Sequence, residues 1–189
     1  MDWGIHLIDA TRYILGEAAP KAVQAAGGIY YFKNKITTPD VLAAHFDFEK
    51  CPVIWQHRMY GAAEFAPEVS NGIFFYCEKE TVFVTDDRWV VVPKDRGQPH
   101  KVNQAQADMG TAHIAAFLTA VRTRKQPEPL VTPADAHLST STVKLAMIAY
   151  ETGSKVTWNA ATVQIEGNAA AARLLKRDYR APWKHPYQG

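Results

Sequence analysis

The residues best suited to chemistry are three polar side chains near the start of the chain, Asp2, His6 and Asp9. A helix turns about 100° per residue, so these three and Tyr13 fall within about 60° of one another. Apolar residues flank this stripe on both sides, which favours a mostly buried helix whose carboxylate and imidazole groups face a cleft. Such groups can hold a hydroxylated ligand and take up its proton, because an imidazole titrates near neutral pH. Asp2 can also serve as the N-cap, and Gly16 as the C-terminal stop.

The same spacing has two other interpretations. An Asp and a His four residues apart are commonly a surface pair, and an acid in the first turn complements the helix dipole. On spacing alone, this structural interpretation is favoured by roughly two to one. A metal site could also include Asp2, His6 and a distant histidine, since a helical i,i+4 pair can chelate. No further ligand is specified, so metal-dependent hydrolysis or isomerisation is the weakest hypothesis.

Bulk composition bounds the class of protein. The chain has 189 residues, of which 47% are hydrophobic and 21% charged, as in one globular domain with a sizeable core. The net charge of +2 indicates neither a nucleic-acid nor a membrane partner, and no apolar run reaches the ~20 residues of a membrane span. Cys51 and Cys77 show no metal or disulfide pattern, which favours a reducing, cytoplasmic compartment unless an upstream export signal exists. The opening helix follows no turn or strand, so we expect a segment upstream of it.

Hydrophobic patterning predicts a run of strands framed by helices. We expect the strand at Lys21–Phe32 to carry a bulge or bend at Gly27-Gly28, and Asp95–Met109 to be a polar linker. Thr132-Pro133-Ala134-Asp135 is a strong helix start, and that helix should run to Thr152. The other expected strands are Val41–Glu49, Val53–Tyr60, Gly72–Glu78, Thr81–Thr85, Trp89–Pro93 and Lys155–Asn159, and the other helices are Thr111–Lys125 and Asn168–Leu175.

These elements predict one α+β domain over residues 1–189, with helices packed on one face of a largely antiparallel open β-sheet. Strands from residues 21 to 93 would form a meander of five or six. The other face of the sheet carries one of two alternating sets of side chains, and the pattern leaves both open. An open face of this size needs a cover, either a second copy of the chain or another domain. The two sets are Trp55, His57 and Met59, and Gln56, Arg58 and Tyr60.

Several signatures of common chemistries are absent from the sequence. No Gly-x-Gly occurs, so the chain contains no dinucleotide fingerprint and no phosphate-binding loop. It has no His-Glu-x-x-His, Cys-x-x-Cys or Gly-x-Ser-x-Gly motif either. The remaining polar candidates on the expected sheet are His45, His57 and Arg58, of which we assign Arg58 as a secondary substrate-binding residue. We assign no metal ligand.

The motifs together resemble a known family. Asp2-x-Gly4-x-His6-x-x-Asp9, with Leu15-Gly16 at its end, resembles the helix that opens the C-terminal domain of the Gfo/Idh/MocA oxidoreductases, the relatives of glucose–fructose oxidoreductase and inositol dehydrogenase. Further resemblances follow in order over nearly the whole chain. They are Pro39-Asp40 before a strand ending in Phe46-Asp47-Phe48, the strand–turn–strand from Gly72 to Thr81, His113–Arg122, and Tyr179-Arg180-Ala181-Pro182-Trp183.

The resemblance implies a two-domain enzyme. An N-terminal Rossmann domain, missing upstream of this chain, would bind NAD or NADP, and this domain would supply the substrate wall and the sheet used for homo-oligomer formation. His6 and Asp2 correspond to the family's site residues: His6 would accept a hydroxyl proton, and Asp2 would hydrogen-bond the substrate or orient His6. We assign Asp9 to structure, paired with Arg12 or a backbone group. The chain alone should be inactive and bind cofactor poorly.

The resulting hypothesis is the substrate-binding and oligomerisation domain of an NAD(P)-dependent oxidoreductase acting on a sugar, inositol or related polyol. The alternative is a non-catalytic, stand-alone dimerisation or binding module of the same fold. The sequence leaves open the individual substrate, the choice between NAD and NADP, and the net reaction, which in this family includes reduction and NAD-dependent glycoside cleavage.

Overall fold

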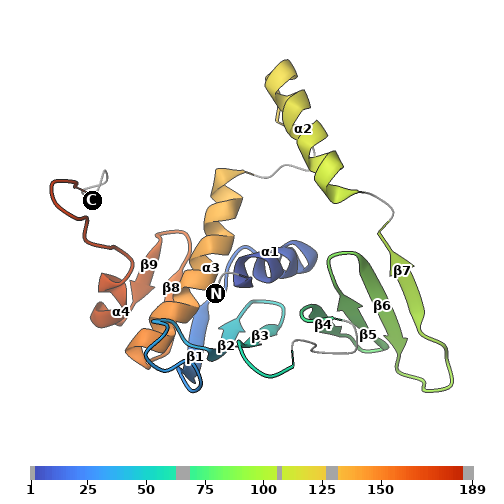
Figure 1. Ribbon diagram of the computed structural model, residues 1–189, viewed down its shortest axis with the longest axis horizontal. Helices are drawn as coiled ribbons and strands as arrows, with labels where there is room; N and C mark the ends of the chain where they lie inside the picture. Colours follow the sequence, from blue (N-terminus) through green and yellow to red (C-terminus); the bar gives the residue numbers. More distant parts are fainter. Residues whose placement is uncertain (1–2, 63–68, 106–107, 127–131, 185–189) are drawn as a thin grey trace. The chain divides into compact units, whose positions relative to one another are not determined.

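The computed structural model describes residues 3–62, 69–105, 108–126 and 132–184. The chain divides into two compact units, one made of residues 1–60 and 137–189 and the other of residues 61–136. The helices are α1 (Gly4–Leu15), α2 (Met109–Thr123), α3 (Pro133–Thr152) and α4 (Ala169–Arg173). The strands, shown in Figure 1, are β1 (Ala22–Gly28), β2 (Val41–Asp47), β3 (Pro52–Arg58), β4 (Ile73–Tyr76), β5 (Glu80–Val84), β6 (Arg88–Pro93), β7 (Lys101–Gln104), β8 (Val156–Asn159) and β9 (Gln164–Glu166).

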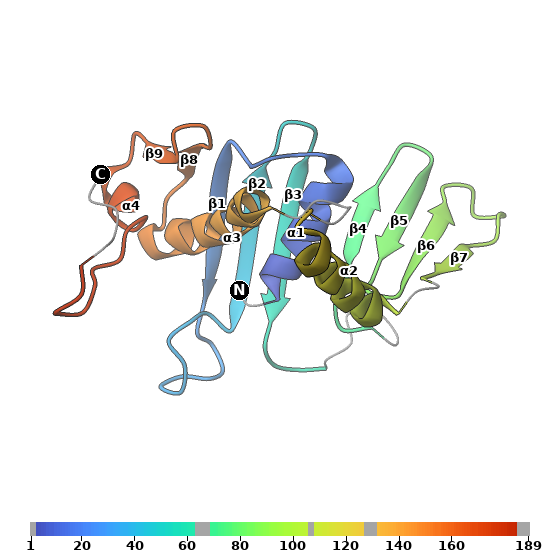
Figure 2. The ribbon, with the colours of Figure 1, turned by 90° about the horizontal axis from the view of Figure 1, so that it is seen from above.

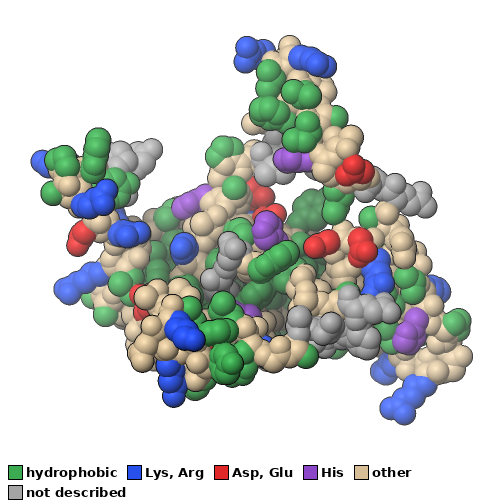
Figure 3. Space-filling model, in the orientation of Figure 1, with side chains coloured by type: hydrophobic (Ala, Val, Ile, Leu, Met, Phe, Trp, Pro, Cys, Tyr) green, Lys and Arg blue, Asp and Glu red, His purple; other side chains and the backbone are tan. Residues whose placement is uncertain are grey.

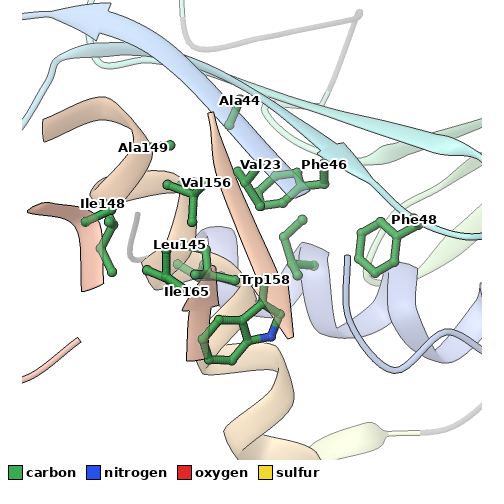
Figure 4. Packing of buried hydrophobic residues seen from close by; sticks show 14 residues of the cluster. Val23, Ala44, Phe46, Phe48, Leu145, Ile148, Ala149, Val156, Trp158 and Ile165 are labelled. Carbon is green, nitrogen blue, oxygen red and sulfur yellow. The ribbon is translucent and has the colours of Figure 1, made fainter. Parts of the chain in front are cut away.

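The first unit is built on an antiparallel five-stranded sheet in the order β3-β2-β1-β8-β9. Helices α1 and α3 lie on one face of this sheet (Figures 1 and 2). Side chains from that face and from the helices form one buried cluster, in which Val23 and Phe46 of the sheet lie near Leu145 of α3 and Trp158 of β8 (Figure 4). The predicted α+β class, with helices on one face of an antiparallel sheet, is confirmed here.

Period-two alternation sets which side chains face the helices. In β2, Leu42, Ala44 and Phe46 are buried, whereas His45 and Asp47 are exposed on the other face, as the sequence predicts. In β3, Val53 and Trp55 pack against the core cluster, so His57 shares the helix side. The open face therefore carries Gln56 and Arg58, which settles the alternative that the sequence left open.

The predicted bulge at Gly27-Gly28 is wrong. Pairing between β1 and β2 continues without interruption to Gly28 opposite Val41. A Cβ atom on Gly27 would lie 2.2 Å from the carbonyl oxygen of Val41. Glycine is needed there because the two backbones approach closely, and the ladder stays regular.

The second unit contains a four-stranded antiparallel sheet in the order β4-β5-β6-β7, followed by α2. Helix α2 begins after Asp108, whose carboxylate accepts hydrogen bonds from the backbone N–H groups of Gly110 and Thr111. Strand β7 lies inside the predicted linker Asp95–Met109, so that prediction is wrong. Its four residues include one apolar side chain, and pairing with β6, rather than an alternating pattern, makes it a strand.

Long-range pairing also separates the observed sheets from the predicted meander. Strands β1 to β3 join β8 and β9 from the C-terminal part of the chain, and β4 to β7 form a second sheet. The three-residue β9 was not predicted at all. The predicted start of α3 is confirmed, since the backbone N–H of Asp135 donates to Thr132 Oγ1 over 3.1 Å. Among the described residues, no helix is both long enough and apolar enough to cross a membrane.

Candidate functional site

Helix α1 carries the residues that the sequence singles out. It ends at Gly16, whose φ of 64° places it in the left-handed region, and the N–H of Glu17 donates to the Arg12 carbonyl over 3.0 Å. The predicted C-terminal stop is therefore confirmed. Lys50 Nζ also donates to the carbonyl of Leu15, which places a cation at the negative end of the helix dipole. Asp2 lies outside the described residues, and Trp3 occupies the N-cap position without a side-chain hydrogen bond.

Helix α1 is more exposed than predicted. Its buried residues are Gly4, Ile8, Thr11 and Arg12. The side chain of Asp9 is 54% exposed, and His6 and Tyr13 are exposed as well. The expectation of a mostly buried helix is therefore wrong. Only one side of α1 packs on the sheet, and the polar stripe lies toward the solvent.

Asp9 and Arg12 have a structural role that the sequence predicts in part. The Arg12 guanidinium is almost fully buried, lies 3.7 Å from an Asp9 carboxylate oxygen and donates through Nε to the Ala18 carbonyl over 2.7 Å. Arg12 Nη1 also donates to Ser139 Oγ, and Ser139 Oγ donates to Asp9 Oδ1. This network ties α1 to α3 and fixes the orientation of the polar stripe. Sequence reasoning missed Ser139, whose only signal is a small polar residue at a buried position of α3.

His6 lies one turn before Asp9 and takes no part in this network. Its ring contacts the Trp3 indole edge to face, with the ring centroids 5.7 Å apart. Among the described residues it makes no hydrogen bond. The structure therefore separates a helix residue that is tied down, Asp9, from an imidazole that is left accessible to a ligand.

A second polar centre holds the end of the sheet nearest the start of α1. The fully buried Asp40 carboxylate accepts hydrogen bonds from the backbone N–H groups of Tyr30, Tyr31 and Phe32 over 2.8 to 2.9 Å. Desolvation is the largest single influence and raises the pKa of Asp40, but the backbone donors together outweigh it and the pKa lies below its usual range. Sequence reasoning noted Pro39-Asp40 only as part of a motif and missed this function.

His57 is held beside Asp40. Trp55 Nε1 donates to His57 Nδ1 over 3.1 Å, and His57 Nε2 lies 3.2 Å from the carbonyl oxygen of Pro39. Because Nδ1 accepts, the proton of the neutral ring is on Nε2 and is donated to Pro39. Burial lowers the pKa of His57, and the hydrogen bond to Pro39 offsets this in part. His57 is thus a neutral structural histidine.

The other candidate residues are dispersed. Arg58 lies on the open face of the sheet, opposite the face that α1 covers, and donates to the Tyr60 carbonyl over 3.4 Å. The structure therefore does not bring Arg58 onto the face that carries His6. His45 is exposed on that open face, and His100 and His113 are exposed elsewhere. No cluster of three metal-ligating side chains occurs in the described part of the chain.

Comparison with known proteins supplies the family. Residues 95–185 match the model of an oxidoreductase family's C-terminal alpha/beta domain, the second C-terminal type of Gfo/Idh/MocA proteins. This part of the chain, just under half of it, is similar to a Gfo/Idh/MocA C-terminal domain. No curated protein matches its sequence.

Solved structures share the fold of this chain. A Thermotoga maritima protein described as an oxidoreductase is 20% identical, with a TM-score of 0.63 over 82% of this chain and 45% of its own. A Desulfitobacterium hafniense protein described as an NADPH-dependent oxidoreductase is 14% identical, with a TM-score of 0.61. The match covers 86% of this chain and 48% of that protein. The UDP-N-acetylglucosamine 3-dehydrogenase of Acidithiobacillus ferrooxidans is 17% identical, with a TM-score of 0.55. The match covers 79% of this chain and 46% of that protein. The chain spans about half the length of these proteins.

Proposed function

We propose that this chain is the substrate-binding and oligomerisation domain of an NAD(P)-dependent oxidoreductase that acts on a sugar, inositol or related polyol. The observation that carries this proposal is the position of His6, an accessible imidazole on a helix that the Asp9–Arg12–Ser139 network fixes in place. The family supports oxidation or reduction as the reaction class.

Oxidation of a secondary alcohol removes a hydride from the carbon and a proton from its hydroxyl group. We assign the proton to His6, because a neutral imidazole can accept it near physiological pH. Asp2, one turn earlier in the sequence, would bind a neighbouring hydroxyl group or orient His6. Arg58 lies on the opposite face of the sheet, so we do not assign it to the same substrate site as His6.

The nicotinamide cofactor would supply the hydride acceptor. The residues of this chain do not fit its pyrophosphate, because the sequence has no Gly-x-Gly loop. Asp108, Thr132 and Asn168 precede α2, α3 and α4, and each side chain accepts a hydrogen bond from a backbone N–H of the first turn. These N–H groups are therefore already capped. We therefore assign cofactor binding to a domain outside this chain, and we assign to this chain only the substrate side of the site.

The open face of the five-stranded sheet supports the oligomerisation part of the proposal. Its central cross-strand row is Ala26, Ala43 and Gln56, and the next row is Gln24, His45 and Ile54. The two alanines are small, and none of the six side chains is a carboxylate, an ammonium or a guanidinium group, so a second copy can pack on these rows. An Ala26→Arg change should convert the oligomer to monomer in analytical ultracentrifugation, whereas Lys33→Glu in an exposed turn should leave its mass unchanged.

The test of the catalytic assignment is His6→Ala in the enzyme that contains both domains. We expect kcat to fall by about 10²–10⁴-fold, as for loss of a general base. His113→Ala is the matched control, because His113 is exposed on α2 and should keep normal turnover. Near-normal turnover of His6→Ala would contradict the assignment.

The alternative, a non-catalytic assembly module, predicts a different result. In that case the chain would dimerise with increasing concentration, and no sugar or polyol would raise its melting temperature. Ligand-dependent stabilisation that His6→Ala abolishes would favour the enzyme.

A further inference from the structure

An exposed tryptophan lies beside the imidazole that we assign as the base. Trp3 is 58% exposed, and its ring centroid lies 5.7 Å from that of His6, with the two ring planes at 61°. The residues are three positions apart, and helical side chains lean toward the N-terminus, so the His6 ring lies over the turn that contains Trp3. Aromatic pairs favour such an edge-to-face arrangement. The indole therefore bounds the N-terminal side of the imidazole.

Neither helix capping nor core packing accounts for Trp3. Among the residues that the structure describes, its side chain makes no hydrogen bond at the N-cap position of α1. Asp108 and Asn168, at the starts of α2 and α4, accept hydrogen bonds from backbone N–H groups, which an indole cannot do because its nitrogen is only a donor. A single exposed apolar side chain is common on protein surfaces. What distinguishes Trp3 is its contact with His6.

This contact is the described interaction that restrains the His6 side chain. His6 is exposed, and within the described part of the chain no hydrogen bond holds either ring nitrogen. His57 is different, because Trp55 and the Pro39 carbonyl bind its two nitrogens. A general base must hold its nitrogen within hydrogen-bond reach of the hydroxyl group, and a misplacement of about 1 Å can lower the rate about 10²-fold. The orientation of the imidazole is therefore a requirement of the proposed chemistry.

We propose that Trp3 is a positioning residue for His6, and that its indole holds the imidazole in the orientation from which it accepts the proton of the substrate. This inference rests on the proposed function and adds a residue to its site. A ring contact leaves both imidazole nitrogens available, whereas a hydrogen bond would occupy one of them. An aromatic pair favours its orientation by about 2- to 12-fold over the alternatives, and this sets the size of the expected effect.

The orientation of His6 can be measured in this chain without any substrate. NMR couplings about the first side-chain torsion of His6 should indicate a single rotamer in the wild type and in Trp3→Phe, and rotamer averaging in Trp3→Ala. Tyr30→Ala is the matched control, because Tyr30 is 59% exposed and lies in a turn away from α1. Averaging in the wild type, or a single rotamer in Trp3→Ala, would overturn the positioning role.

Kinetics of the enzyme that contains both domains test the consequence for catalysis. The assay offers myo-inositol, D-glucose and D-glucitol with NAD and with NADP, and follows the pair that the wild type turns over fastest. Trp3→Ala should lower kcat by about 2- to 12-fold at unchanged KM, because the contact matters only when the proton is transferred. Trp3→Phe should restore most of kcat, and Tyr30→Ala should leave it unchanged. A fall in kcat that Trp3→Phe does not restore, together with a lower melting temperature, would assign Trp3 to stability alone.

The double variant shows whether Trp3 acts through His6. In a His6→Ala background, Trp3→Ala should cause no further loss of kcat, because no imidazole remains to be oriented. A further loss would show that Trp3 acts on the substrate itself and would overturn the positioning role. A fall in kcat for His6→Ala beside normal kcat for Trp3→Ala would reject the role of Trp3 and keep the proposed function. Normal kcat in both variants would reject both.

Discussion

The two units of the chain treat their apolar residues differently. In the first unit, α1, α3 and the five-stranded sheet enclose one core, where Phe46 is completely buried. In the second unit, Phe83 is the one described hydrophobic residue that is buried, and α2 has no buried residue. Phe117 of α2 is 60% exposed, and Figure 3 shows hydrophobic side chains along this helix.

The difference is not one of sequence pattern. The residues Ile114, Phe117, Leu118 and Val121 recur with the same helical period that marks the inner side of a packed helix. In α1 and α3 that period corresponds to burial, and in α2 it does not. An amphipathic pattern therefore shows that a face is suited to packing, but the pattern does not show what covers it. The first unit should hold its structure by itself, whereas the second should depend on other surfaces.

Dividing the chain gives the largest expected effect. A protein in which residues 61–131 are replaced by a flexible Gly/Ser linker of about ten residues should keep the five-stranded sheet and unfold cooperatively. Residues 61–136 alone should lack cooperative unfolding, because they bury too little apolar surface. Circular dichroism during thermal unfolding checks both. Cooperative unfolding of residues 61–136 alone would contradict the expected difference between the two units.

Truncating one phenylalanine in each unit compares the stability that a buried and an exposed side chain contribute. Phe46→Ala should lower the free energy of unfolding by about 3–5 kcal/mol, because it leaves a cavity in a closed core. Phe117→Ala should change it by less than about 0.5 kcal/mol, as at an exposed position. Urea denaturation of the whole chain measures both. A loss above about 1 kcal/mol for Phe117→Ala would show that α2 packs against apolar surface in solution.

Local signals in the sequence predict most of the first unit. Alternation in β2, the Thr-Pro start of α3 and the glycine end of α1 are each set by a few adjacent residues, and the structure confirms all three. Pairing with distant segments cannot be obtained in this way. Strand β9 has three residues, and β7 has a single apolar residue. Both are strands because they pair with β8 and β6, and their own sequence does not predict that pairing.

The candidate site was predicted less completely than the fold. The spacing of His6 and Asp9 placed both on one helical stripe, but it could not show that Asp9 binds Ser139, 130 residues away, while His6 remains accessible. The motif Pro39-Asp40 gave no sign that its carboxylate would bind three amides of the preceding turn. Such contacts form only when β1 and β2 pair, and they are therefore properties of the folded chain.

Removing a hydroxyl group from each unit compares buried and exposed hydrogen bonds. Ser139→Ala should lower the free energy of unfolding by about 1–3 kcal/mol, because the buried Arg12 guanidinium loses an acceptor. Thr119→Ala removes an exposed hydroxyl that donates to the Ala115 carbonyl in α2, and should cost less than about 0.5 kcal/mol. Chemical denaturation measures both, and equal losses would contradict the difference in burial.

Replacing a histidine should change the pH dependence of the unfolding free energy in the first unit but not in the second. Of the effects predicted here, this one is the smallest. Burial lowers the pKa of His57 in the folded protein, so the unfolded chain binds a proton at its ordinary pKa of about 6.5 before the folded chain does. Stability from this group is therefore present above that pH and is lost as the pH falls toward the folded pKa. A proton on Nδ1 would also oppose the indole N–H of Trp55. His57→Gln should flatten the fall in unfolding free energy between about pH 7.5 and 5.5, whereas His113→Gln on exposed α2 should leave it unchanged. Parallel curves for wild type and His57→Gln would show that His57 is protonated as easily in the folded chain as in the unfolded one.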